Sequence, residues 1–303
     1  MIILSPYVLL KEFAGQLYKS RAGFRCFAIS LTFSLISIAV NAQTFFGAGA
    51  EALGRAGRAA NIAIEDHFLN PAGLAFSQSI NMGVAFQESD ISLSTPTNSY
   101  NVIITNNNPE EFAAGGLAFV TNRFSYTDRI VNDQDISLDI AFHLAPTISF
   151  GVQEHRLWRT DNAGNSYTKY NTTVGFLALP RSWFGIALVA YDLFGDTDNV
   201  LNPAIALGTN LIIMDLVHFR MDLVRPTQQN PTGNGSLNVG AEFDLNYGFM
   251  LRAGALWDGI ANTRFWTGGV GWDGPNLSLA YAYRSNIDST NDVTETFQAS
   301  THF

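Results

Sequence analysis

The sequence has little charge, one cysteine and almost no lysine. Charged residues make up 14% of its 303 positions, which is low for a soluble protein of this length. Residues 1–42 carry a net +3 of the total −9, so the remainder has a net charge of −12, with Lys169 as its only lysine. Nucleic-acid binding is therefore excluded, because it needs clustered basic side chains to neutralise phosphates.

Long apolar runs are also missing beyond the N-terminus. No run there approaches the roughly 20 residues that a membrane-spanning helix needs, although 47% of the residues are hydrophobic and 13% aromatic. The single cysteine, Cys26, lies in the N-terminal region, so the rest of the chain can form no disulfide framework and no cysteine-based metal site. Many apolar residues without a long apolar run favour a membrane β-barrel, in which they occupy every second position.

The N-terminal region has the pattern of a secretion signal. Arg21 and Arg25 precede an apolar run over 27–40, and Ala42 ends a small-residue motif suited to cleavage. A short membrane anchor is the alternative, which the shortness of the run disfavours. We expect residues 1–42 to be an N-terminal extension with a cleaved signal peptide.

Residues 43–78 are rich in glycine and alanine. The stretch 50–64 has a helical composition, with Arg55 and Arg58 on one side. Asn70-Pro71 then ends any helix, because the residue before a proline disfavours α-helical geometry. An ordinary linker helix is one interpretation. With a barrel downstream, we predict instead a plug, or hatch, that folds into the barrel lumen.

From residue 79 onwards the apolar residues alternate with a period of two, which indicates strands with one apolar and one polar face. In 237–246 the odd positions are apolar, and the even positions are polar or glycine. A soluble β-sandwich alternates as well, so the length of the runs decides. They match the roughly 9–11 residues with which a tilted strand crosses a bilayer and exceed the about 5–6 typical of soluble strands.

Fourteen such segments can be counted, an even number, as bacterial single-chain barrels have. They are 79–90, 97–106, 111–122, 133–144, 146–158, 165–178, 181–194, 201–210, 212–224, 235–246, 248–258, 263–273, 276–286 and 293–303. Tight turns alternate with longer polar connections, as between the two sides of an outer membrane. The expected fold is an all-β, transmembrane, antiparallel β-barrel of about 14 strands over 79–303, with an N-terminal plug.

Aromatic residues gather near the expected strand ends, as in the girdles at membrane interfaces. They are Trp158, Trp183, Tyr191, Trp257, Trp272, Tyr281 and Tyr283. The chain ends at Phe303, and a terminal aromatic residue on an amphipathic strand resembles the signal that the bacterial barrel-assembly machinery recognises. Thr301 departs from that signal, in which a larger apolar residue is usual. We expect outer-membrane lipid and the assembly machinery as partners, and the bacterial outer membrane as the location.

Two stretches, Gly47 to Ala59 and Glu65 to Ala75, together resemble the start of mature FadL/TodX-type outer-membrane transporters and their smaller PorV-like relatives. In that group a Gly/Ala-rich segment leads to an acidic residue and an Asn-Pro-Ala turn before the first strand. The matching positions here are Glu65, Asp66 and Asn70-Pro71-Ala72. The resemblance implies a fourteen-stranded barrel plugged by its hatch. It also implies that hydrophobic molecules bind outside, pass the hatch and leave through a gap in the wall.

Charged side chains occupy the faces expected to point into the lumen, where they can bond to one another and to Arg55, Arg58 and Glu65 of the plug. They are Asp139, His143, Glu154, His218, Arg220, Asp222, Glu242, Asp244, Arg252 and Arg284. Filling the interior with satisfied polar groups is the plain interpretation. A polar pathway is the alternative.

Catalysis has weak support in the sequence, which leaves an outer-membrane enzyme as the third hypothesis, and no metal or cofactor is expected. The five histidines stand without a motif such as Gly-x-Ser-x-Gly, and His218 lies about 13 Å from Asp222 by strand rise. A metal site needs three or four convergent ligands, which the spacing does not indicate. We therefore predict no enzyme but an outer-membrane channel for small hydrophobic or amphipathic molecules, plugged at rest. The alternative is a non-transporting barrel that anchors secreted or surface partner proteins.

Overall fold

A computed structural model of the chain describes residues 45–77, 79–90, 98–106, 113–125, 130–194, 203–227, 235–259, 262–289 and 292–303. The expected signal peptide and the first two residues of the expected plug lie outside this part. Among the described residues, no helix is both long and apolar enough to cross a membrane.

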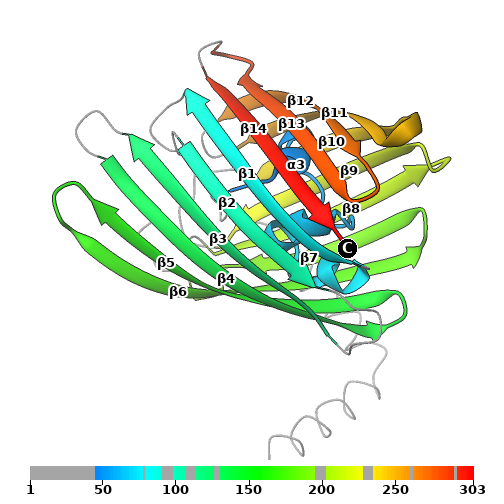
Figure 1. Cartoon of the computed structure of the whole chain (residues 1–303), viewed down its shortest axis with the longest axis horizontal. Helices are drawn as coiled ribbons and strands as arrows, with labels where there is room; N and C mark the ends of the chain where they lie inside the picture. Colours follow the sequence, from blue (N-terminus) through cyan, green and yellow to red (C-terminus); the bar gives the residue numbers. More distant parts are fainter. Residues whose placement is uncertain are drawn as a thin grey trace, which may run out of the picture. The chain divides into compact units, whose positions relative to one another are not determined.

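Fourteen antiparallel strands form one closed barrel (Figure 1). They are β1 (Ile80–Asp90), β2 (Asn98–Asn106), β3 (Ala114–Ser125), β4 (Ile130–Ala145), β5 (Ile148–Asp161), β6 (Ser166–Arg181), β7 (Phe184–Tyr191), β8 (Ala204–Ile213), β9 (Val217–Pro226), β10 (Ser236–Asp244), β11 (Phe249–Asp258), β12 (Thr263–Asp273), β13 (Leu277–Asn286) and β14 (Val293–His302). Each strand pairs with its neighbours in sequence, and β1 closes on β14. The predicted antiparallel β-barrel of fourteen strands is confirmed.

Alternation along the strands decides which residues face outwards. In β10, Val239 and Phe243 are exposed, whereas Asn238, Gly240 and Glu242, at the alternate positions, are buried. This follows because successive side chains of a strand point to opposite faces. Large apolar side chains stay exposed all around the barrel, for example 57% for Val102. An apolar outer face with a polar inner face makes this a transmembrane barrel.

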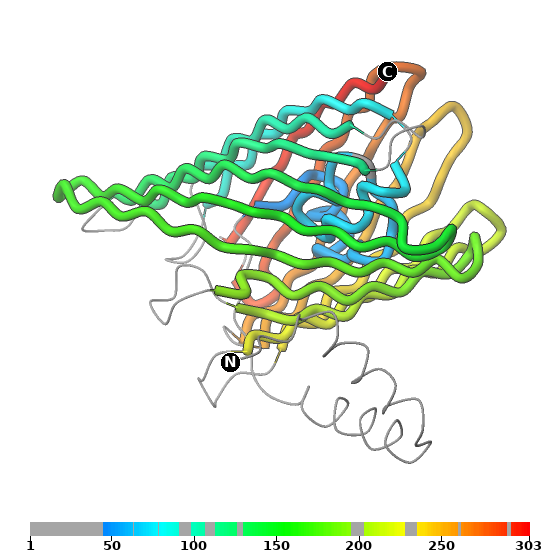
Figure 2. The backbone as a smooth tube through the Cα atoms, turned by 90° about the horizontal axis from the view of Figure 1, so that it is seen from below, coloured from blue at the N-terminus to red at the C-terminus, as the bar shows by residue number. Residues whose placement is uncertain are grey.

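The connections differ between the two ends of the barrel. At one end, β4–β5, β6–β7 and β8–β9 are joined by tight turns, and there Phe303 pairs through its backbone with Ile80. At the other end the connections 192–203 and 227–235 are longer. Strands β4 to β6 project beyond their neighbours at this second end (Figures 1 and 2).

Residues 45–77, called the N-terminal segment from here on, lie within the ring of strands in both views (Figures 1 and 2). The segment contains α3 (Ala48–Ala52), η1 (Ala63–Glu65), α4 (Asp66–Leu69) and η2 (Pro71–Phe76). Its side chains pack against inward-facing residues of the wall. Ala48 and Ala52, for example, share a buried cluster with Ala282 of β13.

Glycines on the inner wall allow the backbone of the segment to approach the strands directly. A Cβ atom at Gly151 would clash with the Pro71–Ala72 backbone, and one at Gly254 would clash with the Leu53–Gly54 backbone. Because only glycine lacks a Cβ, these positions permit a contact that any other residue would block.

Candidate functional site: the N-terminal segment in the lumen

Arg58 joins the N-terminal segment to two strands. Its Nε donates to the Tyr191 hydroxyl at 2.7 Å, and its Nη1 donates to Oδ2 of Asp222 at 2.9 Å. The same carboxylate oxygen accepts from the backbone N–H groups of Gly57, at 2.8 Å, and Arg58, at 3.1 Å. Arg58 is 2% exposed and Asp222 is 0% exposed, so this is a buried and multiply bonded ion pair of the kind that is costly to break.

Tyr191 has a different place from the one expected. We predicted an interfacial aromatic residue, but Tyr191 faces inwards from β7 and is buried. Its hydroxyl donates to the backbone carbonyl of Leu69 and accepts from Arg58. The reason is that every second residue of β7 faces inwards. Tyr191 belongs to the same set as Gly185, Ala187 and Val189, which are also buried. Position near a strand end does not by itself tell which face a side chain occupies.

Glu51 makes a second charged link between the segment and the wall. Its Oε1 accepts from Arg55 Nη2 at 2.7 Å and from Arg284 Nη1 of β13 at 3.2 Å. Arg284 also donates to Oγ1 of Thr294 at 2.9 Å. The carbonyl of Arg55 accepts from Asn238 of β10 at 3.1 Å. Both arginines were predicted to lie in the plug or the lumen, but Glu51, whose carboxylate joins them, was not.

Glu65 and Asp66 stabilise the N-terminal segment through hydrogen bonds within it. The two oxygens of Glu65 accept from the backbone N–H groups of Gly49, at 2.8 Å, and Ala50, at 2.6 Å, which are donors that the first turn of a helix leaves unpaired. Asp66 accepts from the N–H of Ile62 at 3.1 Å. Both carboxyl groups are fully buried, and this burial raises the pKa of Glu65 and raises that of Asp66 well above its ordinary value.

The Asn70-Pro71-Ala72 turn is seated against β5 and β6. Asn70 Oδ1 accepts from the Ala72 N–H at 3.1 Å, and its Nδ2 donates to the Arg58 carbonyl at 2.9 Å. Pro71 starts η2, where the missing N–H of a proline does no harm. Ser149 Oγ of β5 donates to the Ala72 carbonyl at 2.7 Å. A side chain at Gly175 of β6 would clash with Asn70 Oδ1.

His67 fits between two side chains of β4. Its Nε2 lies 2.7 Å from Ser137 Oγ, and its Nδ1 lies 2.6 Å from Asp139 Oδ2. The carbonyl of His67 accepts from Gln153 Nε2 of β5 at 2.7 Å. These residue types occur in nucleophilic triads, but here Ser137 is 7% exposed and the other two are fully buried. No substrate carbonyl can approach the hydroxyl, so the arrangement attaches the segment to the wall.

Charged residues of β9 to β11 form a ladder near the end with tight turns. Glu242 accepts from Arg220 and from Arg252, each at 2.5 Å, and His218 Nε2 lies 3.1 Å from Asp244 Oδ2. Ligand atoms of His218, Glu242 and Asp244 lie within 4.8 Å of one another. A metal ion there would have to displace two guanidinium groups from Glu242, so the cluster fits an ion-pair ladder better than a metal centre.

A cavity of about 440 Å³ lies between this ladder and the N-terminal segment. Its lining is mixed: Ile62 and Glu65 come from the segment, whereas Phe184, Ile212 and Arg252 come from the wall. Apolar side chains and ion-paired groups therefore face the same space.

Two further residues that were expected in the lumen, His143 and Glu154, lie on different faces of the wall. His143 of β4 packs edge-on against Phe76 of the segment, with ring centroids 4.7 Å apart. Glu154 was expected in the lumen, but it is exposed on the outward face of β5, where it accepts from Thr172 Oγ1 at 2.6 Å. The prediction for Glu154 was wrong because it rested on charge alone. Gln153 and His155, on either side of Glu154, are the residues that face inwards.

The inward glycines are the feature that sequence reasoning missed. They occur in nine strands, on the face that is otherwise polar, and lie close enough to the N-terminal segment that a Cβ would meet its atoms. They are Gly83, Gly116, Gly151, Gly175, Gly185, Gly208, Gly240, Gly254 and Gly269. A glycine on the polar face of strand after strand is a signal that could have predicted close contact with an inserted segment.

The fold and this lumen define a fourteen-stranded transmembrane barrel with an N-terminal segment bonded to its inner wall. Comparisons of the sequence with models of known families and with curated proteins found no match. Similar solved structures exist, and the titles of several of them name channels or transporters. They share the fold of this chain at low sequence identity.

One of them is described as "CymD monoaromatic hydrocarbon channel", with a TM-score of 0.70, 14% identity, and coverage of 88% of this chain and 99% of that one. The toluene transporter TbuX of Ralstonia pickettii has a TM-score of 0.65 and 12% identity, covering 86% of this chain and 97% of that one. The toluene transporter TodX of Pseudomonas putida has a TM-score of 0.63 and 10% identity, covering 86% and 98%.

Proposed function

We propose that this protein is a bacterial outer-membrane channel for small hydrophobic or amphipathic molecules, closed at rest by its N-terminal segment. In this proposal residues 1–42 are a leader with a cleaved signal peptide, residues 43–78 form the plug, and residues 79–303 form the transmembrane wall. The end of the barrel with tight turns faces the periplasm, as is usual for outer-membrane barrels.

The observation that carries the proposal is the set of bonds between the segment and the wall. Arg58 reaches β7 and β9, Glu51 reaches β13, and His67 reaches β4. A segment held on several sides of a barrel blocks the route along its axis. Release or local rearrangement of these contacts is then the opening step.

The similar structures indicate the class of solute. Their titles name a monoaromatic hydrocarbon channel and two toluene transporters. The cavity of about 440 Å³ beside the segment is within the roughly 300–1,000 Å³ range of small-molecule sites. Its mixed lining suits a molecule with an apolar body and a polar group.

Uptake of radiolabelled toluene by intact bacterial cells, whose lipopolysaccharide leaflet slows hydrophobic solutes, tests the proposal. A disulfide between Ala52→Cys and Ala282→Cys, two positions in one buried cluster, would tether α3 to β13. We expect uptake with the unmodified protein, loss of uptake when the tether is oxidised, and recovery when it is reduced. Each single cysteine variant is the matched control. Uptake equal to that of cells without the protein would contradict the transport proposal.

The second candidate is a non-transporting barrel that anchors partner proteins. The same bonds between the segment and the wall also favour this function. Buried ion pairs such as Arg58–Asp222 would suit a permanently filled lumen. The tether separates the two candidates, because a scaffold would perform equally well with the segment fixed in place.

A further inference from the structure

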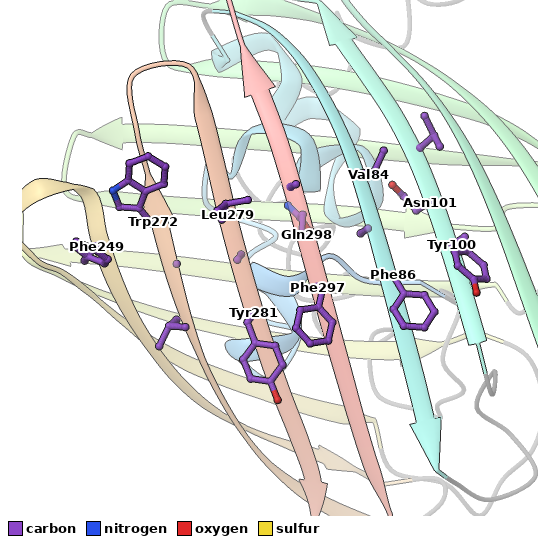
Figure 3. Close-up of a pocket in the computed structure, with 16 residues that line it drawn as sticks. Val84, Phe86, Tyr100, Asn101, Phe249, Trp272, Leu279, Tyr281, Phe297 and Gln298 are labelled. Carbon is purple, nitrogen blue, oxygen red and sulfur yellow. The ribbon is translucent and has the colours of Figure 1, made fainter.

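A long apolar groove of about 980 Å³ runs over the outward face of the barrel where β1 closes on β14 (Figure 3). Strands β1, β2 and β11 to β14 contribute to it. Its apolar lining includes Val84, Val102, Phe249, Val270, Trp272 and Leu279. Ala299 of β14 lies in its middle, opposite Val84 on one side and Leu279 on the other. The small side chain of Ala299 keeps this stretch of the groove deep.

Four aromatic rings border the groove towards the end of the barrel with longer connections. Phe86 and Tyr100 have centroids 5.0 Å apart, and Tyr281 and Phe297 have centroids 4.8 Å apart. Phe86 faces Phe297 across the β1–β14 pairing. Rings on the outer surface near strand ends are typical of the level at which lipid headgroups begin.

Two carboxylates occupy the next outward positions beyond these rings. Glu88 of β1 and Glu295 of β14 are direct partners across the same pairing, and the Tyr281 hydroxyl donates to Glu295 Oε1 at 3.1 Å. Asp90 follows on the same face. Like charges directly opposite each other destabilise a strand pair. In the part of the chain that the structure describes, no basic side chain pairs with Glu88 or Glu295.

We propose that this groove binds a single-chain amphiphile with a protonated amine headgroup. The ammonium group sits between Glu88 and Glu295, and the apolar chain runs from there along the strands, past Phe86 and Phe297, to Ala299 about 13 Å away. An ammonium group has three N–H donors and neutralises the repulsion between the two carboxylates. The rim of aromatic rings adds cation–π attraction. A neutral headgroup would leave the repulsion between the two carboxylates unchanged, and an anionic headgroup would add a third negative charge.

This site lies on the outer wall and is independent of the proposed passage through the lumen. Its occupant is defined by charge complementarity at one end of an apolar groove. An outer-leaflet lipid held through a divalent cation is a different occupant, because its own headgroup is anionic and the metal ion would be the group that meets the carboxylates.

Native mass spectrometry of the full chain in a neutral detergent tests the proposal with dodecylamine, dodecanol and dodecyl phosphate, the last with and without Mg²⁺. We expect one retained dodecylamine, bound about tenfold more tightly than dodecanol, with a preference that falls as salt rises. The double variant Glu88→Gln/Glu295→Gln should remove the preference and retain the weaker binding of the alcohol. Ala299→Phe should weaken both by filling the groove.

Glu154→Gln is the matched control, because it removes an outward, exposed carboxylate on β5, far from the groove in the strand order. It should leave the preference unchanged. Equal binding of amine and alcohol, or a preference that survives the double variant, would overturn the proposal. Tighter binding of dodecyl phosphate in Mg²⁺ than of dodecylamine would overturn it in favour of a metal-bridged lipid.

Discussion

The two halves of the N-terminal segment are held by different kinds of contact. Residues 48–60 face β7 to β13 and combine close contacts with wall glycines, such as Gly254, with two buried ion pairs, Arg58–Asp222 and Glu51–Arg284. Residues 66–76 face β4 to β6 and rely on close backbone approach and short hydrogen bonds, as at Ala72. The first half is thus held by ion pairs and close packing together, whereas the second is held mainly by close packing and hydrogen bonds, with His67–Asp139 as its charged contact.

The difference has a consequence for how each half is released. A buried ion pair fails when one partner is removed, because the other charge is left in a dry interior. A glycine contact fails when any side chain is added, because two backbones can no longer meet. Mutations in the two halves should therefore differ in size and in whether a second change rescues them.

The largest effect should come from Arg58→Ala. It leaves Asp222, which is fully buried, without its cation, and removal of one partner of a buried pair costs about 3–5 kcal/mol. We expect the free energy that keeps the segment seated to fall by this amount, measured as faster hydrogen exchange over residues 45–60. Adding Asp222→Asn should restore most of the loss. Arg181→Ala, at an exposed position near a turn, is the control.

The next effect should come from Gly175→Ala. A Cβ there clashes with Asn70 Oδ1, and such overpacking costs about 1–3 kcal/mol. Hydrogen exchange should quicken in residues 66–76 more than in 48–60, with no dependence on salt. Gly115→Ala, where a Cβ would have only an ordinary contact with the Asp139 carbonyl at 3.5 Å, should change nothing. Equal loosening of both halves would contradict the division.

A smaller effect is expected from pH. Burial raises the pKa of Asp66 above its ordinary value of 3.8, so the seated segment binds this proton more readily than the released one. The stabilisation is complete below the released-state pKa and is lost as pH rises through the seated-state pKa. The seated segment should therefore loosen as pH rises above the released-state pKa of Asp66, measured as channel open probability. Asp66→Asn should flatten this slope. A slope of opposite sign would refute the assignment.

The smallest effect should come from Arg264→Ala. Arg264 and Asp288 form an ion pair at 2.6 Å on the outside of the barrel, with the two side chains 59% and 50% solvent-exposed in the absence of lipid. Exposed pairs contribute little to stability. We expect no change in hydrogen exchange of either half of the segment, which makes this variant a baseline for the others.

The strands could be predicted because alternation is a local property of the sequence. Asn238 and Val239 show by their own polarity which face each occupies, and the same rule placed Asp139, His218 and Arg284 on the inner wall. Local patterns carry no information about partners across the lumen. Glu51, His67 and Tyr191 therefore went unrecognised, because their partners across the lumen lie at least 70 positions away, such as Ser137 for His67 and Arg284 for Glu51.

The central claim is that the N-terminal segment closes the barrel, and conductance in planar bilayers tests it most directly. The unmodified protein should be silent, whereas a variant lacking residues 43–72 should give large and stable conductance steps. The variant's barrel must first be shown to be folded. Silence of a folded deletion variant, or large steps from the unmodified protein, would contradict the account.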